Sequence, residues 1–551
     1  MSPRRAVPGL VFVLLALMTQ HSACWAERDA SAGELLKQAQ STASPAERIK
    51  LLDKALSNES LRGEILSQIF FERGRAYKEM NDCYRAIEDL GSALAHSRSA
   101  LAALLQKAEC FILIDQPEQA TADVEHYLSI KPGDAYAYVL KGMIYEKQGF
   151  LAKAEDEYGR ALHYESGSPP ALTARAHVRL KLGHPRSALE DADKLCTLLP
   201  RDPEVFMLRA KVFVKLKEHE AALKDYARVE SLNPGDGRVV REKVLVYFET
   251  GRPDKALEAL STDSHNLRDD VRYLVLRARA YILLGNYGQA EQSLKRAVEI
   301  APDHASAYLY FGVVAMRRGL MDEALEYFNR ALALDRNLVE AYKERARTFI
   351  QLRDNVRAAA DLTTAAELDP ADAEIFSMRG ITYMNRMLYD AAVKDFTRAI
   401  DNLPGNPGIL FDRAVANHHR DHLESALSDL NHVVTARPDS ARARSLRGVV
   451  QFQLGNAPQA REDLEEATKV NPQDAQVWNN LGFFRYKMGD QRGAMDAFNR
   501  ALQIDSQYDT ARYNLTLVLK REETMAPLGP RPGLTESEEI PIDQPFSDHA
   551  R

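Results

Sequence analysis

Long apolar segments, cysteine and excess positive charge are all scarce in this 551-residue chain. After Met18, no stretch offers the ~18 uninterrupted apolar residues that a membrane-spanning helix needs, so a polytopic membrane protein is excluded. The four cysteines are Cys24, Cys83, Cys110 and Cys196. So few thiols cannot build a disulfide framework, and the fold must be stabilised by packing. A net charge of −7 without a basic tail argues against a nucleic-acid partner.

The N-terminus differs from the rest of the chain. Arg4 and Arg5 precede an apolar run over residues 6–18, and small residues follow at 22–26. This order is typical of a secretory signal peptide, and we predict cleavage after Ala26, which gives residues 1–26 as the signal. The alternative is a lipoprotein with a lipid anchor at Cys24, although His21 stands where that signal normally has leucine. An uncleaved anchor is a further alternative.

The remaining chain is longer than one hydrophobic core supports, so it forms several domains or a repeat array. A 34-residue period fills residues 67–508 without insertion or deletion, in thirteen windows that start at 67, 101, 135, 169, 203, 237, 271, 305, 339, 373, 407, 441 and 475. Position 20 is always alanine: Ala86, Ala120, Ala154, Ala188, Ala222, Ala256, Ala290, Ala324, Ala358, Ala392, Ala426, Ala460 and Ala494.

Three further columns place two helices in each window. Position 8 is glycine or alanine except at Val244, so two helix axes can approach closely. Position 15 is most often glycine, which supplies a left-handed residue after the first helix. Position 32 is proline in eight windows and stops the second helix. We predict helices at positions 3–14 and 19–31.

This pattern resembles the tetratricopeptide repeat (TPR). The last window matches the family motif best, through Trp478, Leu481, Gly482, Tyr486, Gly489, Ala494, Phe498 and Ala501. The resemblance implies an all-α fold, a right-handed α-α superhelix of about thirteen helical hairpins. It also implies that the chain holds partner proteins.

The flanks complete the expected domain plan. Residues 27–66 are expected to add an N-terminal capping hairpin, because Ser44 to Glu47 forms a capping box with Pro45 at the first helical position. Residues 509–523 are predicted to continue as a C-terminal capping helix. Residues 524–551 hold five prolines and many acids without apolar periodicity, so we expect this tail to be disordered.

One column departs from the TPR pattern. Position 7, leucine in the family, is arginine or lysine in eleven windows. Position 23 is acidic in nine of those eleven and in neither of the two windows with an apolar residue at position 7, where Phe311 faces Tyr327 and Leu481 faces Ala497. A cation between packed helices is costly unless it is paired, so we predict nine ion pairs within hairpins. A basic column for anionic ligands is the alternative interpretation.

The best candidate for metal chemistry is the cluster His418, His419 and His422. His418 and His422 stand four residues apart, a spacing that suits a helical metal site. In repeat coordinates, however, the segment crosses from the first helix into a turn, so we interpret it as a surface cluster and predict no metal ligands and no cofactor. The array, its caps and the tail use the whole mature chain, and we therefore predict no enzyme activity.

The resemblance suggests which side chains meet a partner, since positions 2, 5, 9, 12 and 13 face inward in the family. These positions are basic in the earlier repeats and apolar in repeats ten to thirteen. An extended or helical partner segment, acidic with an apolar anchor, would suit them. The candidate partner-binding residues are Lys147, His177, Lys181, Lys211, Lys215, Arg279, Arg317, Arg347, Phe411, Phe452, Phe483 and Tyr486. Solvated lysines and apolar residues packed between helices are the alternative interpretation.

The sixth repeat breaks several rules together. Val244 fills the small-residue position, Lys243 faces Ala259, and Asp263 replaces an apolar residue at position 27. Solenoids depend on nearest-neighbour contacts, so we predict a weak joint here between a block of five repeats and a block of seven.

These observations together predict an exported scaffold that binds partner segments in cell-envelope or secretory-pathway assembly. A structural subunit of an envelope complex is one alternative. A metal-dependent enzyme that uses the cluster at 418–422 is the other. The compartment would be the periplasm or the exterior in a bacterium, and the endoplasmic reticulum lumen or the exterior in a eukaryote.

Overall fold

The computed structural model describes residues 32–57, 61–97, 99–262 and 269–520. The signal segment at 1–26, the lipidation candidate Cys24 and the tail at 524–551 lie outside these ranges. Within them the chain folds only into helices and turns, without a strand, and the predicted all-α class is confirmed. None of the described helices combines the length and apolar character that crossing a bilayer requires.

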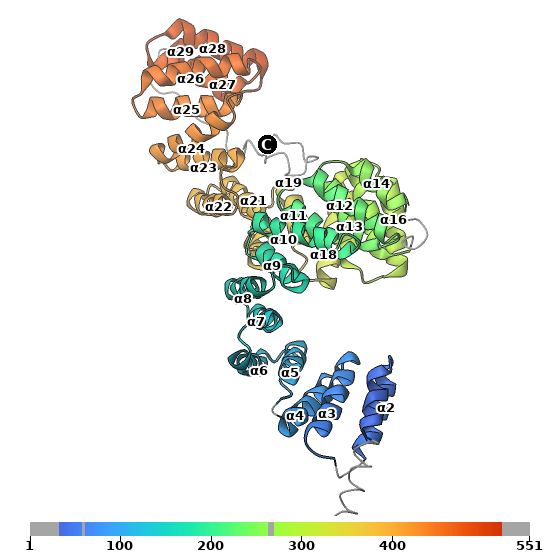
Figure 1. Ribbon diagram of the computed structural model, residues 1–551. Coiled ribbons are helices and arrows are strands. Elements are labelled where there is room, and N and C mark those ends of the chain that lie inside the picture. The colour runs from blue at the N-terminus through green and yellow to red at the C-terminus, as the bar shows by residue number, and fades with distance from the viewer. Residues whose placement is uncertain (1–31, 58–60, 98, 263–268, 521–551) are drawn as a thin grey trace, which may run out of the picture. The chain divides into compact units, whose positions relative to one another are not determined.

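The chain divides into two compact units, Met1–Val239 and Val240–Arg551. In the first unit, successive helices pack as antiparallel hairpins, and each hairpin stacks on the next (Figure 1). Its helices are α2 (Pro45–Leu56), α3 (Gly63–Glu79), α4 (Cys83–His96), α5 (Ala102–Leu113), α6 (Pro117–Ile130), α7 (Ala135–Lys147), α8 (Leu151–Tyr164), α9 (Pro169–Lys181), α10 (Pro185–Leu198), α11 (Pro203–Lys215) and α12 (His219–Leu232).

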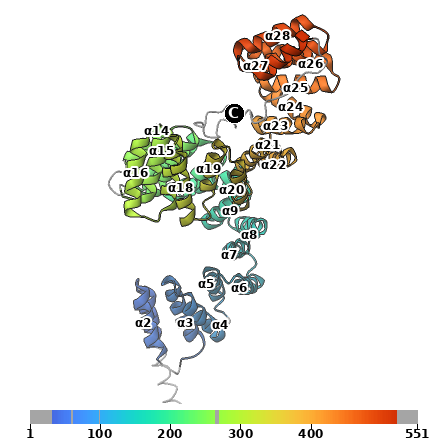
Figure 2. The same cartoon turned by 180° about the vertical axis from the view of Figure 1, so that it is seen from behind.

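The boundary between the units falls inside α13 (Gly237–Glu249), the first helix of the sixth repeat. The second unit continues the same stacking, and Figure 2 shows α25 to α28 as successive neighbours from behind. Its helices are α14 (Pro253–Thr262), α15 (Val271–Leu283), α16 (Tyr287–Ile300), α17 (Ala305–Arg317), α18 (Met321–Leu334), α19 (Val339–Gln351), α20 (Asn355–Leu368), α21 (Ala373–Asn385), α22 (Tyr389–Asn402), α23 (Pro407–His419), α24 (Leu423–Ala436), α25 (Ala441–Gln453), α26 (Ala457–Val470), α27 (Ala475–Lys487), α28 (Gln491–Ile504) and α29 (Asp509–Lys520).

The helices start about two residues earlier than the sequence predicted. In the third repeat, α7 begins at position 1 rather than 3, because Asp134 caps it. The Asp134 carboxylate accepts hydrogen bonds from the backbone N–H groups of Tyr136 at 2.9 Å and Ala137 at 3.2 Å. Other helices begin with proline, whose missing N–H costs nothing in the first turn, as Pro169 shows in α9.

Position 15 adopts the left-handed conformation in all thirteen repeats, as predicted for the glycines. Seven of these residues are glycine, for example Gly149 at φ 80°. The other six carry side chains in a region that disfavours them: Asn81, Asp115, Lys217, Arg353, Met387 and Asp421, with φ between 59° and 63°. The turn geometry therefore outweighs the local preference of these residues.

The small-residue columns let the two helices of each hairpin approach closely. All thirteen position-20 alanines are fully buried. Position 8 faces position 24: a Cβ added to Gly380 would lie 2.6 Å from Cε1 of Phe396, and one added to Gly482 would lie 2.7 Å from Cε1 of Phe498. Glycine at position 8 thus makes room for the aromatic ring at position 24.

Both ends of the described array are covered by further helices. Residues 32–41 form a helix that shares a cluster with α2 and α3, in which Leu36, Leu52 and Ile69 are buried. The predicted capping box does not form, since the Ser44 side chain makes no capping hydrogen bond, but α2 starts with Pro45 as predicted. At the other end, Leu517 and Val518 of α29 are buried.

The sixth repeat departs from the pattern of the other twelve at the small-residue position. Its second helix α14 is described as far as Thr262, where the described residues stop. Val244 is fully buried at the small-residue position. Asp263, the third irregular residue that the sequence singled out, lies outside the described residues.

Candidate functional site

All nine predicted ion pairs between positions 7 and 23 are present. The seven arginine pairs have N–O distances of 2.6 to 2.8 Å, while the two lysine pairs measure 2.9 and 3.8 Å. The pairs are Arg73–Asp89, Lys107–Asp123, Lys141–Glu157, Arg175–Asp191, Arg209–Asp225, Arg345–Asp361, Arg379–Asp395, Arg413–Asp429 and Arg447–Asp463. The structural interpretation of this column is confirmed.

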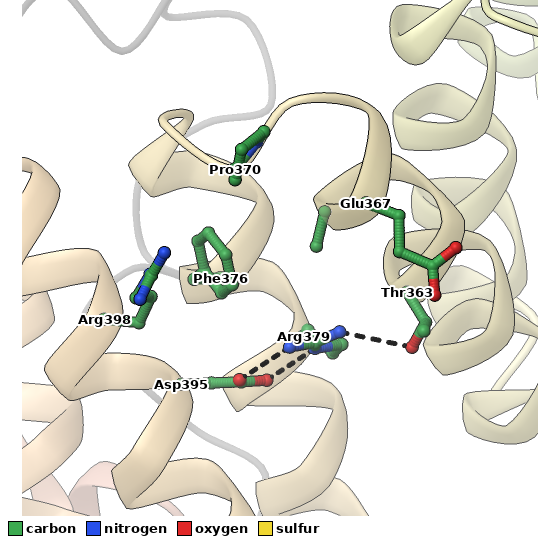
Figure 3. A pocket seen from close by; sticks show the side chains of 8 residues that line it. Thr363, Glu367, Pro370, Phe376, Arg379, Asp395 and Arg398 are labelled. Atoms are coloured by element: carbon green, nitrogen blue, oxygen red, sulfur yellow. Dashed lines mark hydrogen bonds and ion pairs between the residues drawn. The ribbon is translucent and has the colours of Figure 1, made fainter.

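Arg379 shows the geometry of the arginine pairs. Its Nε and Nη2 donate to the two carboxylate oxygens of Asp395 at 2.7 and 2.8 Å, a two-point contact between planar groups (Figure 3). The side chains are only 15% and 9% exposed. The hydrogen bond to Asp395 raises the pKa of Arg379, against the opposing effect of burial. Both charges therefore serve the hairpin rather than an external ligand.

The lysine pairs are weaker versions of the same contact. Nζ of Lys107 lies 2.9 Å from Oδ1 of Asp123, and Oδ2 of this carboxylate is buried without a hydrogen bond in the described structure. Burial raises the pKa of Asp123, and Lys107 offsets only part of that effect. A single ammonium cannot satisfy a carboxylate as a guanidinium does.

The ion-pair column includes a third residue that was not predicted from the sequence. Nη1 of Arg379 also donates to Oγ1 of Thr363, at 3.2 Å, and Thr363 is position 25 of the preceding repeat (Figure 3). The cation thus ties its own hairpin to the one before it. The same tie joins Lys141 to Glu125, Arg209 to Asp193, Arg345 to Asn329, Arg413 to Thr397 and Arg447 to Asn431.

Two further pairs lack this tie for a visible reason. Ahead of Lys107 and Arg175, position 25 is Gly91 and Gly159, which have no side chain to offer. A polar residue at position 25 of the preceding repeat was the sequence feature from which this contact could have been predicted. In the first repeat, Arg73 uses Asp53 of α2 instead, at 2.6 Å, so the column also holds the capping hairpin.

A hollow of about 400 Å³ lies beside the Arg379 pair, between the ninth and tenth repeats. Figure 3 shows Phe376 and Pro370 on one side of it and Glu367 on the other. The guanidinium of Arg398 lies 5.7 Å from the centre of the Phe376 ring. The remaining lining residues are Thr363, Ala366, Arg379 and Asp395. Arg379, Asp395 and Arg398 in its lining are engaged in the contacts described above.

The predicted basic residues of the first unit fall into two groups. Lys147 and Lys181 are exposed but bound to acids, with Nζ at 3.2 Å from Asp115 and 2.6 Å from Glu146. The exposed His177 is hydrogen-bonded within its own helix, Nδ1 to the Thr173 carbonyl at 2.9 Å. Lys211 and Lys215 are exposed on α11. Neither forms an ion pair with another described residue.

The cations of the second unit are largely neutralised by neighbouring acids. Arg347 is half-buried between Glu344 and Glu374, which it contacts directly. Lys343, next to it on α19, is buried and pairs with Glu374 at 2.6 Å and with Asp372 at 3.0 Å. Repeats nine and ten are therefore less basic than their cation count suggests.

Two other candidates in the second unit are also partly enclosed. The guanidinium of Arg279 lies 4.6 Å from the centre of the Phe248 ring. Arg317, at the end of α17, is half-buried. Neither side chain is therefore fully exposed to solvent.

The four predicted aromatic residues divide by exposure. Phe411 is 3% exposed and belongs to the core of α21 to α25, so it packs between helices rather than lining an open face. Phe452, Phe483 and Tyr486 are half-exposed. Phe452 packs edge-to-face on Phe484, with the ring centres 5.3 Å apart.

The histidine cluster is engaged in ordinary contacts. Nε2 of His418 lies 3.0 Å from Oε1 of Gln453, and His419 stacks on Tyr389 with ring centres 4.7 Å apart. Burial lowers the pKa of both histidines. His422 stands at the N-cap position of α24, where its side chain makes no capping hydrogen bond. In the described part of the chain, no three histidine, cysteine or acidic side chains gather as a metal site would require.

The three described cysteines are free, buried thiols. Burial raises the pKa of Cys110 to about 12 and the pKa of Cys196 to about 11. Both thiols are therefore protonated at neutral pH and are poor nucleophiles.

Comparison with known proteins assigns the family. The tetratricopeptide-repeat model TPR_16 matches seven overlapping stretches, residues 173–237, 208–262, 241–304, 275–338, 343–407, 378–441 and 446–509. These stretches cover more than half of the chain, which therefore belongs to the tetratricopeptide-repeat family. The repeats of this chain form a protein-interaction scaffold, and TPR proteins are generally non-enzymatic.

Similarity to individual proteins covers only part of each of them. The human mitochondrial import receptor subunit TOM70 is 22% identical over 325 residues, 57% of this chain and 47% of that protein. The human SGT1 homolog is 35% identical over 83 residues, 15% of this chain and 23% of that protein. The chain thus spans less than half the length of either relative. The solved Cut9–Hcn1 tetramer of the APC/C aligns with 89% of this chain and 95% of that one, at 16% identity and a TM-score of 0.45.

Proposed function

We propose that this chain is an exported scaffold that binds segments of partner proteins through its first-helix face. That face comprises positions 2, 5, 9, 12 and 13 of the first helix of each repeat. The observation that carries the proposal is which side chains are used inside the hairpins and which are accessible on the first-helix face. Nine of the eleven position 7 cations are bound inside the hairpins, whereas exposed lysines and half-exposed aromatic rings lie on the first-helix face.

The partner's chemistry follows from the accessible side chains. Lys211 and Lys215 offer two exposed cations one helical turn apart, so they suit acidic residues in an extended or helical segment. Phe452, Phe483 and Tyr486 suit an aliphatic or aromatic anchor. Lys147 and Lys181 would contribute only where a partner acid displaces Asp115 or Glu146.

Export is proposed from the N-terminal segment alone. Cleavage after Ala26 would leave Glu27 as the first residue, and an envelope or secretory role would follow from that location. Intact mass and N-terminal sequencing of the protein from its native cells test this directly. A chain that begins at Met1 would remove the proposal of export, and a lipid-modified Cys24 would replace the cleavage site with the lipoprotein alternative.

Photo-crosslinking in the native compartment tests the binding role. A photoreactive amino acid in place of Lys211 or Phe483 should capture a partner protein, because both residues lie on the first-helix face. Lys194 on α10 and Lys224 on α12 are exposed positions on second helices and serve as matched controls. Equal capture at all four positions, or capture only of other copies of this chain, would contradict the proposal. The second outcome would support a structural subunit of an assembly.

We propose no catalytic role for the histidine cluster. The first and second histidines already have partners in Gln453 and Tyr389. Stoichiometric zinc in the purified protein, lost in a His418→Ala variant, would overturn this part of the proposal.

A further inference from the structure

Four aromatic side chains lie on consecutive first helices at the end of the second unit. They are Phe452 on α25, Phe483 and Tyr486 on α27, and Tyr513 on α29. The first three are half-exposed, and Tyr513 is 50% exposed. The helices are direct neighbours, since α25 contacts α27 and α27 contacts α29. We call these four residues the aromatic strip.

Two exposed cations stand at one end of the strip. Lys487 is the last residue of α27 and Lys520 is the last residue of α29. Both side chains are exposed, and neither forms an ion pair with another described residue. The Lys487 ammonium lies 5.5 Å from the centre of the Phe483 ring. Apolar rings thus lie next to uncompensated positive charge.

The chain itself contains a segment with the complementary chemistry. Glu536, Glu538 and Glu539 precede Ile540, Ile542 and Phe546. Between residues 532 and 548 there is no lysine or arginine. A proline disfavours a helical conformation of the residue before it, so we expect an extended rather than a helical segment to present Ile540 and Ile542. Three acids are therefore followed by a short apolar edge.

We propose that residues 536–546 of this chain bind the aromatic strip of the same molecule. The three glutamates meet Lys487 and Lys520, and the two isoleucines and Phe546 pack on the rings of α25, α27 and α29. This inference rests on the proposed function, because it makes the tail a tethered competitor for part of the first-helix face. External partners would have to displace it.

The connection is long enough for this arrangement. Glu536 follows Lys520 by 16 residues, which span at most about 55 Å when extended. The segment carries too little apolar surface to form a core of its own, but a ready-made apolar surface lets such a segment order on binding. Tethering raises its local concentration to the millimolar range, so even a weak contact would be occupied most of the time.

Lysine labelling in the full-length protein tests the contact. The tail variant Glu536→Gln, Glu538→Gln, Glu539→Gln leaves the array untouched, so it cannot act by unfolding it. We expect acetylation of Lys487 and Lys520 to become at least about twofold faster in this variant, because a tethered segment at millimolar effective concentration protects them in the parent. Lys469 on α26 is exposed but lies on a second helix, and its rate should not change.

Crosslinking identifies which surface the tail contacts. Benzoylphenylalanine in place of Phe546 should give crosslinks within one molecule to α25, α27 or α29, and the additional changes Ile540→Ser and Ile542→Ser should abolish them. Unchanged labelling of Lys487 and Lys520 in the glutamine variant would overturn the inference. So would crosslinks that form only between molecules or that map to α9 and α11.

The two proposals fail in different ways. If the tail does not crosslink to the strip while a photoreactive group at 483 still captures a partner protein, the tail contact is wrong and the scaffold role stands. If the tail crosslinks to the strip but photoreactive groups at residues 211 and 483 capture no partner protein in the native compartment, the scaffold role fails while the tail contact stands.

Discussion

Nε of Arg379 donates a hydrogen bond to Oδ2 of Asp395 at 2.7 Å, between the two helices of the tenth repeat. Eight other repeats contain the same pair of positions with opposite charges in contact. The usual leucine of the family has been replaced by a cation whose cost of burial is met by a specific acid. The charges at positions 7 and 23 are thus part of the hairpin, and the binding surface that we propose uses other positions.

Removal of the acid should destabilise the repeat. Asp395→Ala leaves the Arg379 guanidinium, 15% exposed, without its two-point partner, at a cost of about 1–3 kcal/mol. Denaturant unfolding of the full chain measures this, and hydrogen exchange of α21 and α22 locates it. The double variant Arg379→Leu, Asp395→Ala reproduces the Leu481 and Ala497 combination of the last repeat. It should recover most of the loss, and equal losses in the single and double variants would contradict the ion-pair account.

Strain at the left-handed turn residues can be relieved. Lys217 adopts φ 63°, a conformation that costs a residue with a Cβ about 1–2 kcal/mol. Lys217→Gly should stabilise the fifth repeat by about 0.5–1 kcal/mol, since glycine also loses more entropy on folding. Lys224→Gly, at an exposed interior position of α12, is the matched control and should destabilise by about 1 kcal/mol. If Lys217→Gly instead destabilises the repeat, the lysine side chain contributes more to stability than the relief of backbone strain does.

The sixth repeat should be the first point of proteolysis in the array. Val244 fills its small-residue position, and the boundary between the compact units falls in its first helix. Limited digestion should cut between residues 257 and 270 and leave fragments of five and seven repeats. The change Asp263→Ala restores the family residue at position 27 and should slow the cut. Digestion that starts elsewhere in the array and spares 257–270 would count against the weak joint.

The stability of repeats eleven and twelve should depend on pH through His418 and His419. Burial lowers the pKa of both below the ordinary value of 6.5, so the folded state favours the neutral rings. Their contribution to stability is fully present above pH 6.5 and is lost as the pH falls through the lower folded pKa values. Hydrogen exchange of α23 and α25 at pH 7 and pH 5 measures this loss. A double variant with His418→Gln and His419→Gln should show less pH dependence, and an unchanged dependence would assign the effect to other groups.

Structural features were predicted correctly from the sequence where the same repeat position serves the same physical role in every repeat. Buried Ala392 and the left-handed turn at Gly149 follow directly from residue size and backbone freedom. The ion pairs were visible because acid and cation vary together. The contact of Arg379 with Thr363 was missed because it links two repeats and uses neutral as well as charged acceptors.

The predicted binding residues were harder to assign. Repeat position alone does not show how far a neighbouring helix covers a side chain, and Phe411 is buried for that reason. Nor does it show which acids lie nearby in space: Glu374 comes from the repeat after Arg347 and neutralises it. Among the predicted residues, Lys211 and Lys215 are exposed and form no ion pair with another described residue, and the aromatic residues of α25 and α27 are half-exposed.

The most direct test of this account is the affinity of the captured partner for the variant Lys211→Glu, Lys215→Glu, measured at low and at high salt. The control is the variant Lys194→Glu, Lys224→Glu, which makes the same charge change on second helices. We predict that the first variant loses about tenfold or more in affinity at low salt and most of its salt dependence, because exposed charges are screened within about 10 Å at 0.1 M. The control should bind as the parent does. Equal affinities and equal salt dependence for the two variants would contradict the assignment of binding to the first-helix face.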